Sequence, residues 1–112
     1  MKRLVEIRSY ILCEGCVDAF ESLFKSAALP MLHRWQVDVV TYGRSAHDPR
    51  AWYLIRAYDD LAHRQASQDA FYGSDEWRNG PREALLVMIE SYQDTVLWLS
   101  PSSIADLAAL NG

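Results

Sequence analysis

The sequence has few of the features that mark specialised classes of protein. Its 112 residues include only two cysteines, five glycines and four prolines. Two cysteines do not make the disulfide framework of a small secreted domain, and so little glycine and proline excludes a collagen-like or low-complexity chain. Acidic residues outnumber basic ones by 15 to 11, which gives a formal charge of −4. Because nucleic-acid-binding proteins usually present a basic face, we expect no nucleic-acid partner.

Long apolar runs are also missing. The longest uncharged stretch, residues 95–105, contains three serines and a proline, and it is far shorter than the roughly 20 apolar residues of a membrane-spanning helix. The first five residues resemble the start of a signal peptide, but Glu6 and Arg8 interrupt the segment that would have to be apolar. These absences predict a cytoplasmic protein with no membrane insertion.

What is present is a globular composition, with 50% apolar and 23% charged residues, which at this length predicts one domain. Alternation of apolar and polar residues predicts four strands, at residues 4–12, 37–44, 51–58 and about 92–99. Apolar residues recurring at every third or fourth position predict helices at residues 17–31, 61–72 and 75–89. Pro30 is expected to kink or stop the first helix, and Gly80-Pro81 to break the last.

The order of these elements is β-α-β-β-α-β, with a short hairpin between the second and third strands. Right-handed crossovers and this hairpin favour an α+β, ferredoxin-like fold, with a four-stranded antiparallel sheet and helices on one face. The alternation is expected to place large aromatic side chains on the open face, namely Tyr10, Trp52, Tyr58 and Trp98. Because a bare apolar face is uncommon on a monomer, we expect a homodimer whose two sheets pack face to face.

Two stretches of the sequence carry a family resemblance. The first is Val5-Glu6-Ile7-Arg8-Ser9-Tyr10, followed by Gly15 and Phe20. The second, more specific one comprises Tyr53-Leu54-Ile55-Arg56-Ala57-Tyr58, Leu61, Arg64, Ala70-Phe71-Tyr72-Gly73-Ser74 and Trp77. Together they are similar to the NIPSNAP family over residues 4–99, which implies a NIPSNAP-like domain at residues 1–100 and a C-terminal tail at 101–112. The resemblance also implies that two ferredoxin-like subunits join into a dimeric α/β barrel.

The resemblance implies a pocket without assigning a reaction. Related dimeric barrels include monooxygenases, haem-degrading enzymes and small-molecule-binding regulators, so the fold alone does not choose among them. The sequence also departs from many family members at two positions. Arg56 stands where a tryptophan is common, which changes the charge of the pocket, and Cys16 stands where a hydroxyl-bearing helix cap is expected.

The candidate ligand-binding residues are polar side chains of the strands and one histidine after the first helix: Arg8, Tyr10, His33, Tyr42, Arg56 and Tyr58. Arginine beside tyrosine in a dry cavity suits a small anionic, enolic or aromatic ligand. In an enzymatic version, His33 or Tyr10 would move a proton while Arg56 holds an enolate or phenolate. The alternative is a structural role, in which Arg8 forms an ion pair with Glu6 or Asp94 across neighbouring strands.

Other chemistries have less support in the sequence. The histidines lack metal-ligand spacing, and neither a phosphate-binding loop nor a nucleophile elbow is present, so we expect no metal centre and no cofactor. The exception is Cys13-Glu14-Gly15-Cys16, because heavy-metal-associated domains of the same β-α-β-β-α-β order bind Cu(I) through two thiolates in this loop. Thiol redox proteins share the spacing. Two alternatives therefore stay open: a metal-handling or redox protein using Cys13 and Cys16, and an interaction module whose barrel serves only dimerisation.

Overall fold

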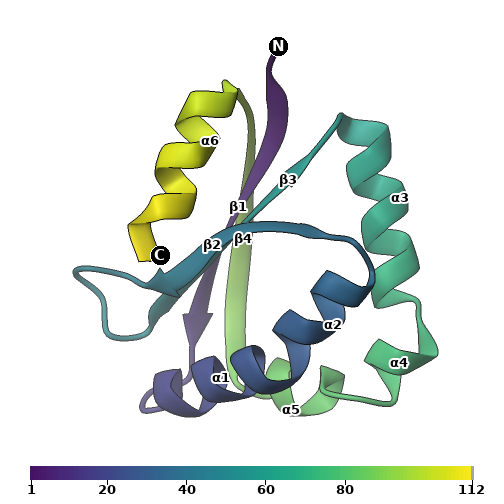
Figure 1. Cartoon of the computed structure of the whole chain (residues 1–112). Helices are drawn as coiled ribbons and strands as arrows, with labels where there is room; N and C mark the ends of the chain where they lie inside the picture. The colour runs from purple at the N-terminus through teal and green to yellow at the C-terminus, as the bar shows by residue number, and fades with distance from the viewer. Residues whose placement is uncertain (112) are drawn as a thin grey trace.

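The chain folds around a single four-stranded antiparallel sheet with helices on both of its sides (Figure 1). The computed structural model describes residues 1–111. The elements in chain order are β1 (Arg3–Leu12), α1 (Val17–Leu23), the π-helix η1 (Phe24–Ala28), α2 (Leu29–Arg34), β2 (Asp38–Arg44), β3 (Ala51–Tyr58), α3 (Leu61–Tyr72), α4 (Asp75–Arg78), α5 (Arg82–Leu86), β4 (Ile89–Leu99), α6 (Pro101–Ala108) and the 3-10 helix η2 (Ala109–Asn111). The strand order β2-β3-β1-β4 confirms the predicted ferredoxin-like α+β fold.

The register of the sheet brings charged residues of neighbouring strands opposite one another. β1 lies between β3 and β4, so Glu6 faces Arg56 on one side and Arg8 faces Asp94 on the other. β4 begins at Ile89, earlier than the sequence predicts, because Ile89 pairs with Leu12 and so extends the ladder into the segment expected to be helical. Sheet pairing here overrides the helical periodicity of the preceding residues.

The first helical segment continues from Val17 to Arg34 without a break in helical structure. Pro30 therefore does not stop this helical segment. The π-helical turn at Phe24–Ala28 directly precedes this proline, and the N–H of Leu29 donates to the carbonyl of Phe24, five residues back. Proline cannot donate an N–H, so a widened turn at this point accommodates its ring in the middle of the segment. The same turn places Phe24 and Ala28 in the protein interior.

The aromatic face of the sheet is covered by α1–α5, which corrects the face assignment made from the sequence. Tyr10, Trp52 and Tyr58 are buried, and only Trp98, on the edge strand β4, is exposed. Phe20 contacts both Tyr10 and Trp52, with ring centroids 5.5 and 5.1 Å apart. The alternation along the strands indicated which residues share a face of the sheet. It did not indicate which face the helices cover, because that depends on the aromatic residues of the helices.

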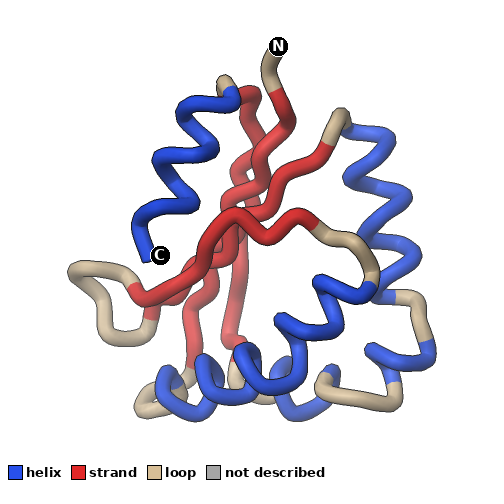
Figure 2. Tube along the Cα trace, viewed as in Figure 1, coloured by secondary structure: helices blue, strands red, loops and turns tan. Residues whose placement is uncertain are grey.

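The opposite face of the sheet is covered in part by α6. Figure 2 shows this helix and the other helices on opposite sides of the strands. Ile104 and Leu107 pack against a second apolar cluster, whose buried members are Val5, Val40, Ile55 and Ala57. The C-terminal tail therefore packs against a cluster of small and β-branched residues. None of the described helices combines the length and the apolar character needed to cross a membrane.

Candidate ligand-binding site

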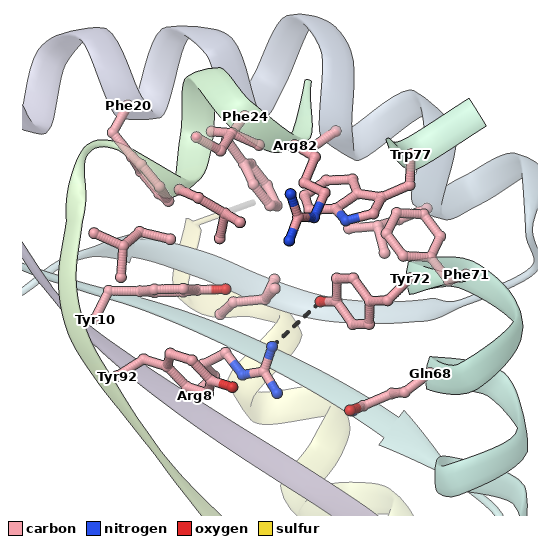
Figure 3. A pocket seen from close by; sticks show the side chains of 16 residues that line it. Arg8, Tyr10, Phe20, Phe24, Gln68, Phe71, Tyr72, Trp77, Arg82 and Tyr92 are labelled. Carbon is pink, nitrogen blue, oxygen red and sulfur yellow. Dashed lines mark hydrogen bonds between the residues drawn. The ribbon is translucent and has the colours of Figure 1, made fainter. Parts of the chain in front are cut away.

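A cavity of about 420 Å³ lies between the sheet and the helices that cover its aromatic face. Its walls are mostly apolar and aromatic, formed by Phe20, Phe24, Ala28, Leu32, Leu54, Phe71, Trp77, Leu85, Leu86 and Ile89. Six polar or amphipathic side chains complete the lining: Arg8, Tyr10, Gln68, Tyr72, Arg82 and Tyr92. Figure 3 shows the polar ends of Arg8, Tyr10, Tyr72 and Arg82 directed toward a common space. An apolar cavity with a few convergent polar groups is the usual form of a small-molecule site.

On the sheet side, the cavity adjoins a network of charged residues that we call the Glu6 cluster: Glu6, Arg8, Arg56, Arg64 and Asp94. Glu6 is fully buried and forms ion pairs with Arg56 and, at 2.7 Å, with Arg64. Arg8 binds Asp94 through two nitrogens, at 2.7 and 3.0 Å. Arg64 also reaches Asp94, at 3.1 Å, and so links the two carboxylates. Three guanidinium groups meet two carboxylates, which leaves the cluster with one net positive charge.

The cluster remains ionised because its members compensate one another. Burial raises the pKa of Glu6, but the charge and hydrogen bond of Arg56, together with Arg8 and Arg64, lower it to about 2. Burial lowers the pKa of Arg8, but the hydrogen bond to Asp94, acting together with Tyr72, Tyr10 and Glu6, raises it above its ordinary value. An ion pair this deeply buried persists only when hydrogen bonds satisfy both partners. Gln68 supplies a further hydrogen bond of 2.5 Å, which its side-chain amide donates to the carboxylate of Glu6.

Tyr72 connects the Glu6 cluster to the cavity. Its hydroxyl oxygen accepts hydrogen bonds from Arg8, at 3.2 Å, and from Arg56, at 2.9 Å (Figure 3 shows the first). A hydroxyl has two acceptor lone pairs and one proton. Because both lone pairs of the Tyr72 hydroxyl accept from guanidinium groups, its proton remains available for a hydrogen bond. The cavity lies next to this hydroxyl. Tyr72 can therefore donate to an oxygen atom placed there.

Tyr10 offers a second phenol to the same space. Burial and the neighbouring Tyr72 raise its pKa, and the positive charges of Arg56 and Arg8 only partly oppose this. Tyr10 is therefore protonated at neutral pH, so it can donate a hydrogen bond but cannot serve as a base. The adjacent Tyr92 lies under the Arg8 guanidinium, whose central carbon is 4.6 Å from the ring centroid. This stacking fixes the arginine at the cavity edge.

Arg82 is the least constrained cation of the cavity. Its side chain is 43% exposed, and its ion pair among residues 1–111 is a 3.5 Å contact with the neighbouring Glu83. In Figure 3 its guanidinium group lies over the cavity, on the side opposite Arg8. Two arginines thus face each other across the space, one held rigidly by Asp94 and one at the mouth.

The structure brings only part of the predicted site together. Arg8 and Tyr10 line the cavity as a pair, although on the helix-covered face rather than inside a barrel. Arg56 is 1% exposed and is bound to Glu6 and Tyr72, so it supports the site without being able to contact a ligand directly. His33 is exposed on α2, outside the cavity lining, and so is not placed to move a proton there.

The other two predicted tyrosines have structural surroundings. Tyr42 packs on Phe24 and Trp52, with ring centroids 5.1 and 5.7 Å apart. Tyr58 is buried, and its hydroxyl accepts from Gln68 at 3.3 Å. The structural alternative for Arg8 is also realised, because Arg8 pairs with Asp94 while it lines the cavity. The two roles proved compatible.

Sequence reasoning missed the helical contributors Gln68, Tyr72 and Arg82. The spacing of Tyr72 and its aromatic neighbours is that of an apolar helix face, which favours a place in the core over a polar role. The available signal was the polar content of that face: a helix packing on Glu6 and Arg8 has to supply hydrogen-bond partners, and α3 carries Arg64, Gln68 and Tyr72 at intervals of four residues.

Cys13 and Cys16 are joined in a disulfide, with Cα atoms 5.3 Å apart. They lie in the loop between β1 and α1, and both are half-buried. Within the described residues, no group of three or more histidine, cysteine, aspartate or glutamate side chains could hold a metal ion. The loop therefore offers two sulfur atoms and no further ligand.

Comparisons with known proteins place this fold and site in context. No curated protein matches the sequence. A NIPSNAP family protein from Agrobacterium tumefaciens superposes with a TM-score of 0.82 at 18% identity, covering 91% of this chain and 90% of the other. An uncharacterized NIPSNAP domain protein from Burkholderia xenovorans gives 0.77 at 21% identity, covering 88% and 95%. A putative antibiotic biosynthesis monooxygenase from Nitrosomonas europaea gives 0.58 at 18% identity, covering 84% and 95%.

These structural likenesses establish the fold alone, since the identities are low. The sequence itself supplies the family, because the NIPSNAP family model matches residues 5–104. That range includes every residue of the cavity lining and all four strands apart from the first two residues of β1. It confirms the resemblance identified from the sequence, and the chain belongs to the NIPSNAP family.

Proposed function

We propose that this protein binds a small aromatic molecule bearing an anionic oxygen, such as a carboxylate or an enolate, in the cavity between its sheet and helices. The observation that carries the proposal is the Tyr72 hydroxyl, which accepts from Arg8 and Arg56 and so has its proton left for a ligand. A phenol polarised by two guanidinium groups is a strong donor to an oxyanion.

The charge of the surroundings supports an anionic ligand. The Glu6 cluster carries one net positive charge, and Arg82 adds another at the cavity mouth. The protonated phenol of Tyr10 supplies a further donor. Between walls that are mostly apolar, these groups favour an anion over its neutral analogue.

The walls of the cavity support an aromatic ligand. Phe71, Tyr72 and Trp77 form one side, with ring centroids within 5.3 Å of one another and Tyr72 edge to face with the other two. A volume of about 420 Å³ lies within the ordinary range of small-molecule sites and accommodates a molecule of two fused rings. A flat ring between these walls would place its substituent near Tyr72 and Arg82.

If chemistry accompanies binding, the residues restrict it to the support of an anionic intermediate. Tyr72 and Tyr10 would stabilise a developing oxyanion by donating hydrogen bonds to it. This replaces the predicted roles of Arg56 and His33, which lie outside the cavity lining. The Nitrosomonas protein described as a putative monooxygenase shares the fold, and binding without turnover is equally compatible with these residues.

A homodimer and a cytoplasmic location stay predictions of the sequence and of the family resemblance. The sheet offers one feature in favour of self-association: β4 is an edge strand of 11 residues with Tyr92 and Trp98 exposed along it. A long unpaired edge with exposed aromatic residues is usually covered by a partner. We propose that a second copy of this chain covers it.

The binding proposal is tested with 1-hydroxy-2-naphthoate as the anionic probe and 1-naphthol as its neutral counterpart, followed by calorimetry. We expect the naphthoate to bind at least about ten times more tightly, because only it presents a carboxylate to the arginines. Arg82→Gln should weaken naphthoate binding about tenfold with little change in folding stability, since this side chain is 43% exposed.

The matched control is Arg34→Gln, which removes an exposed arginine of α2 that is paired with Glu76 outside the cavity. This variant should bind the naphthoate as the unmodified protein does. Equal affinity for the two probes, or equal weakening by Arg82→Gln and Arg34→Gln, would overturn the proposal.

A further inference from the structure

We infer that Cys13 and Cys16 form a thiol–disulfide exchange site, at which the protein is reduced and reoxidised by small thiols and disulfides of the glutathione type. This site is separate from the cavity and does not depend on its function. The inference rests on how the backbone holds the two residues and on their accessibility.

The backbone keeps the cysteines together without help from the disulfide. The N–H of Cys16 donates to the carbonyl of Cys13, at 3.0 Å, which closes a four-residue turn. Gly15, the third residue of this turn, has φ of +76°, the conformation that a type II turn requires there. The dithiol form is therefore preorganised for closure, because both sulfurs remain on one turn when the bond between them is broken.

The turn is also anchored to the rest of the fold at its first residue. The N–H of Cys13 donates to the carbonyl of Met88, at 2.8 Å. The N–H of the preceding Leu12 donates to the carbonyl of Arg50, at 2.8 Å. The Nε of Arg50 donates in turn to the carbonyl of Leu12, at 2.9 Å. These bonds survive reduction, so the cysteines can change oxidation state without unfolding the loop.

The disulfide closes a loop with only Glu14 and Gly15 between the bonded residues. Such a short loop removes little entropy from the unfolded chain, so the bond adds less stability than a long-range disulfide would. Both cysteines are only half-buried, although Cys16 packs partly against the apolar core, so part of each residue is open to solvent where an external thiolate can approach. The chain has no third cysteine, so exchange cannot proceed to an alternative pairing within the protein. An accessible, preorganised pair of this kind is suited to reversible exchange.

The exchange balances with a thiol as the reductant. A thiolate attacks one protein sulfur, which forms a mixed disulfide and releases the other cysteine as a thiolate. A second thiol attacks the mixed disulfide, so that the protein disulfide and two thiols become the protein dithiol and one small disulfide. The reverse sequence reoxidises the protein.

The experiment equilibrates the folded, full-length chain in buffers of varied reduced-to-oxidised glutathione ratio, followed by acid quenching, thiol alkylation and mass spectrometry. We expect an all-or-none change between zero and two alkylated cysteines, with an unchanged far-ultraviolet circular dichroism spectrum. Cys16→Ser should accumulate a glutathione adduct on Cys13, which traps the first step.

Gly15→Ala sharpens the test, because a side chain at this φ strains the turn. It should shift the midpoint toward the dithiol by about three-fold or more in the glutathione ratio, whereas the neighbouring Glu14→Gln should leave it unchanged. The inference is overturned if both cysteines stay alkylated at every ratio, or if the disulfide is reduced only after the protein is unfolded by denaturant.

Discussion

The two faces of the sheet are built from the same strands, yet only one of them buries charged side chains. Along β1, the face toward α1–α5 carries Glu6, Arg8 and Tyr10, and the face toward α6 carries Val5 and Ile7. The first face encloses a cavity and a charged cluster, whereas the second is packed with small and β-branched residues. Closely packed apolar residues are sufficient to stabilise a sheet face, as the second face shows.

The difference indicates that the first face serves more than stability. Burying three guanidinium groups and two carboxylates costs solvation free energy that an apolar core avoids. A cavity also lacks the packing contacts that side chains would make if they filled the space. Both features are explained if the face binds an anionic ligand, because the charges then select the ligand and the cavity receives it.

The largest effect is expected at the centre of the charged cluster. Glu6→Gln leaves the buried Arg56 and the neighbouring Arg64 without their shared carboxylate, and should lower the free energy of unfolding by about 3–5 kcal/mol at pH 7. Urea denaturation measures the change. Ser9→Ala, an exposed position on the other face of the same strand, is the matched control and should change stability by less than about 0.5 kcal/mol.

The same variant has a defined pH dependence. The pKa of Glu6 is lowered to about 2 from an ordinary value of 4.5, so its ionisation stabilises the fold fully above pH 4.5. This contribution is lost as the pH falls from 4.5 toward 2, so the stability difference between the protein and Glu6→Gln should shrink across that range. A difference that stays constant from pH 6 to pH 3 would contradict the role given to Glu6.

A smaller effect separates the cavity from the packed face. Ala57 is buried in the apolar cluster beneath α6, and Ala57→Leu should destabilise the protein by about 1–3 kcal/mol through overpacking. Ala28 lines the cavity, so Ala28→Leu should be accommodated at little cost while it reduces binding of 1-hydroxy-2-naphthoate. Thermal unfolding and calorimetry measure the two effects. Equal destabilisation by both substitutions would show that the cavity has no room to spare.

The smallest effect concerns α6. Leu107 is partly buried against the second cluster, so Leu107→Ala should cost about 1 kcal/mol, less than the 2–5 kcal/mol of a fully buried leucine. Naphthoate affinity should not change, because α6 lies on the other side of the sheet from the helices that enclose the cavity (Figure 1). A loss of affinity in Leu107→Ala would mean that the two faces are coupled.

The sequence predicted the fold well because its signals are local. β3 and α3 have the predicted bounds, as the alternation at residues 51–58 and the Asp60 cap before Leu61 act within a few residues. The site was predicted only in part. Arg8 and Tyr10 could be found from strand parity, but Tyr72 and Arg82 reach the cavity only through the packing of helices on the sheet. Which face these helices cover is a tertiary property, and alternation carries no information about it.

The central proposal is that the ligand binds on the cavity face of the sheet and not on the α6 face. The most direct test is the change in amide chemical shifts of isotopically labelled protein as 1-hydroxy-2-naphthoate is added. We predict changes that saturate and concentrate at Phe71, Leu85 and Ile89, which line the cavity, with none at Ile104 and Leu107 of α6. Changes centred on Ile104 and Leu107, or no saturable change at millimolar probe, would contradict it.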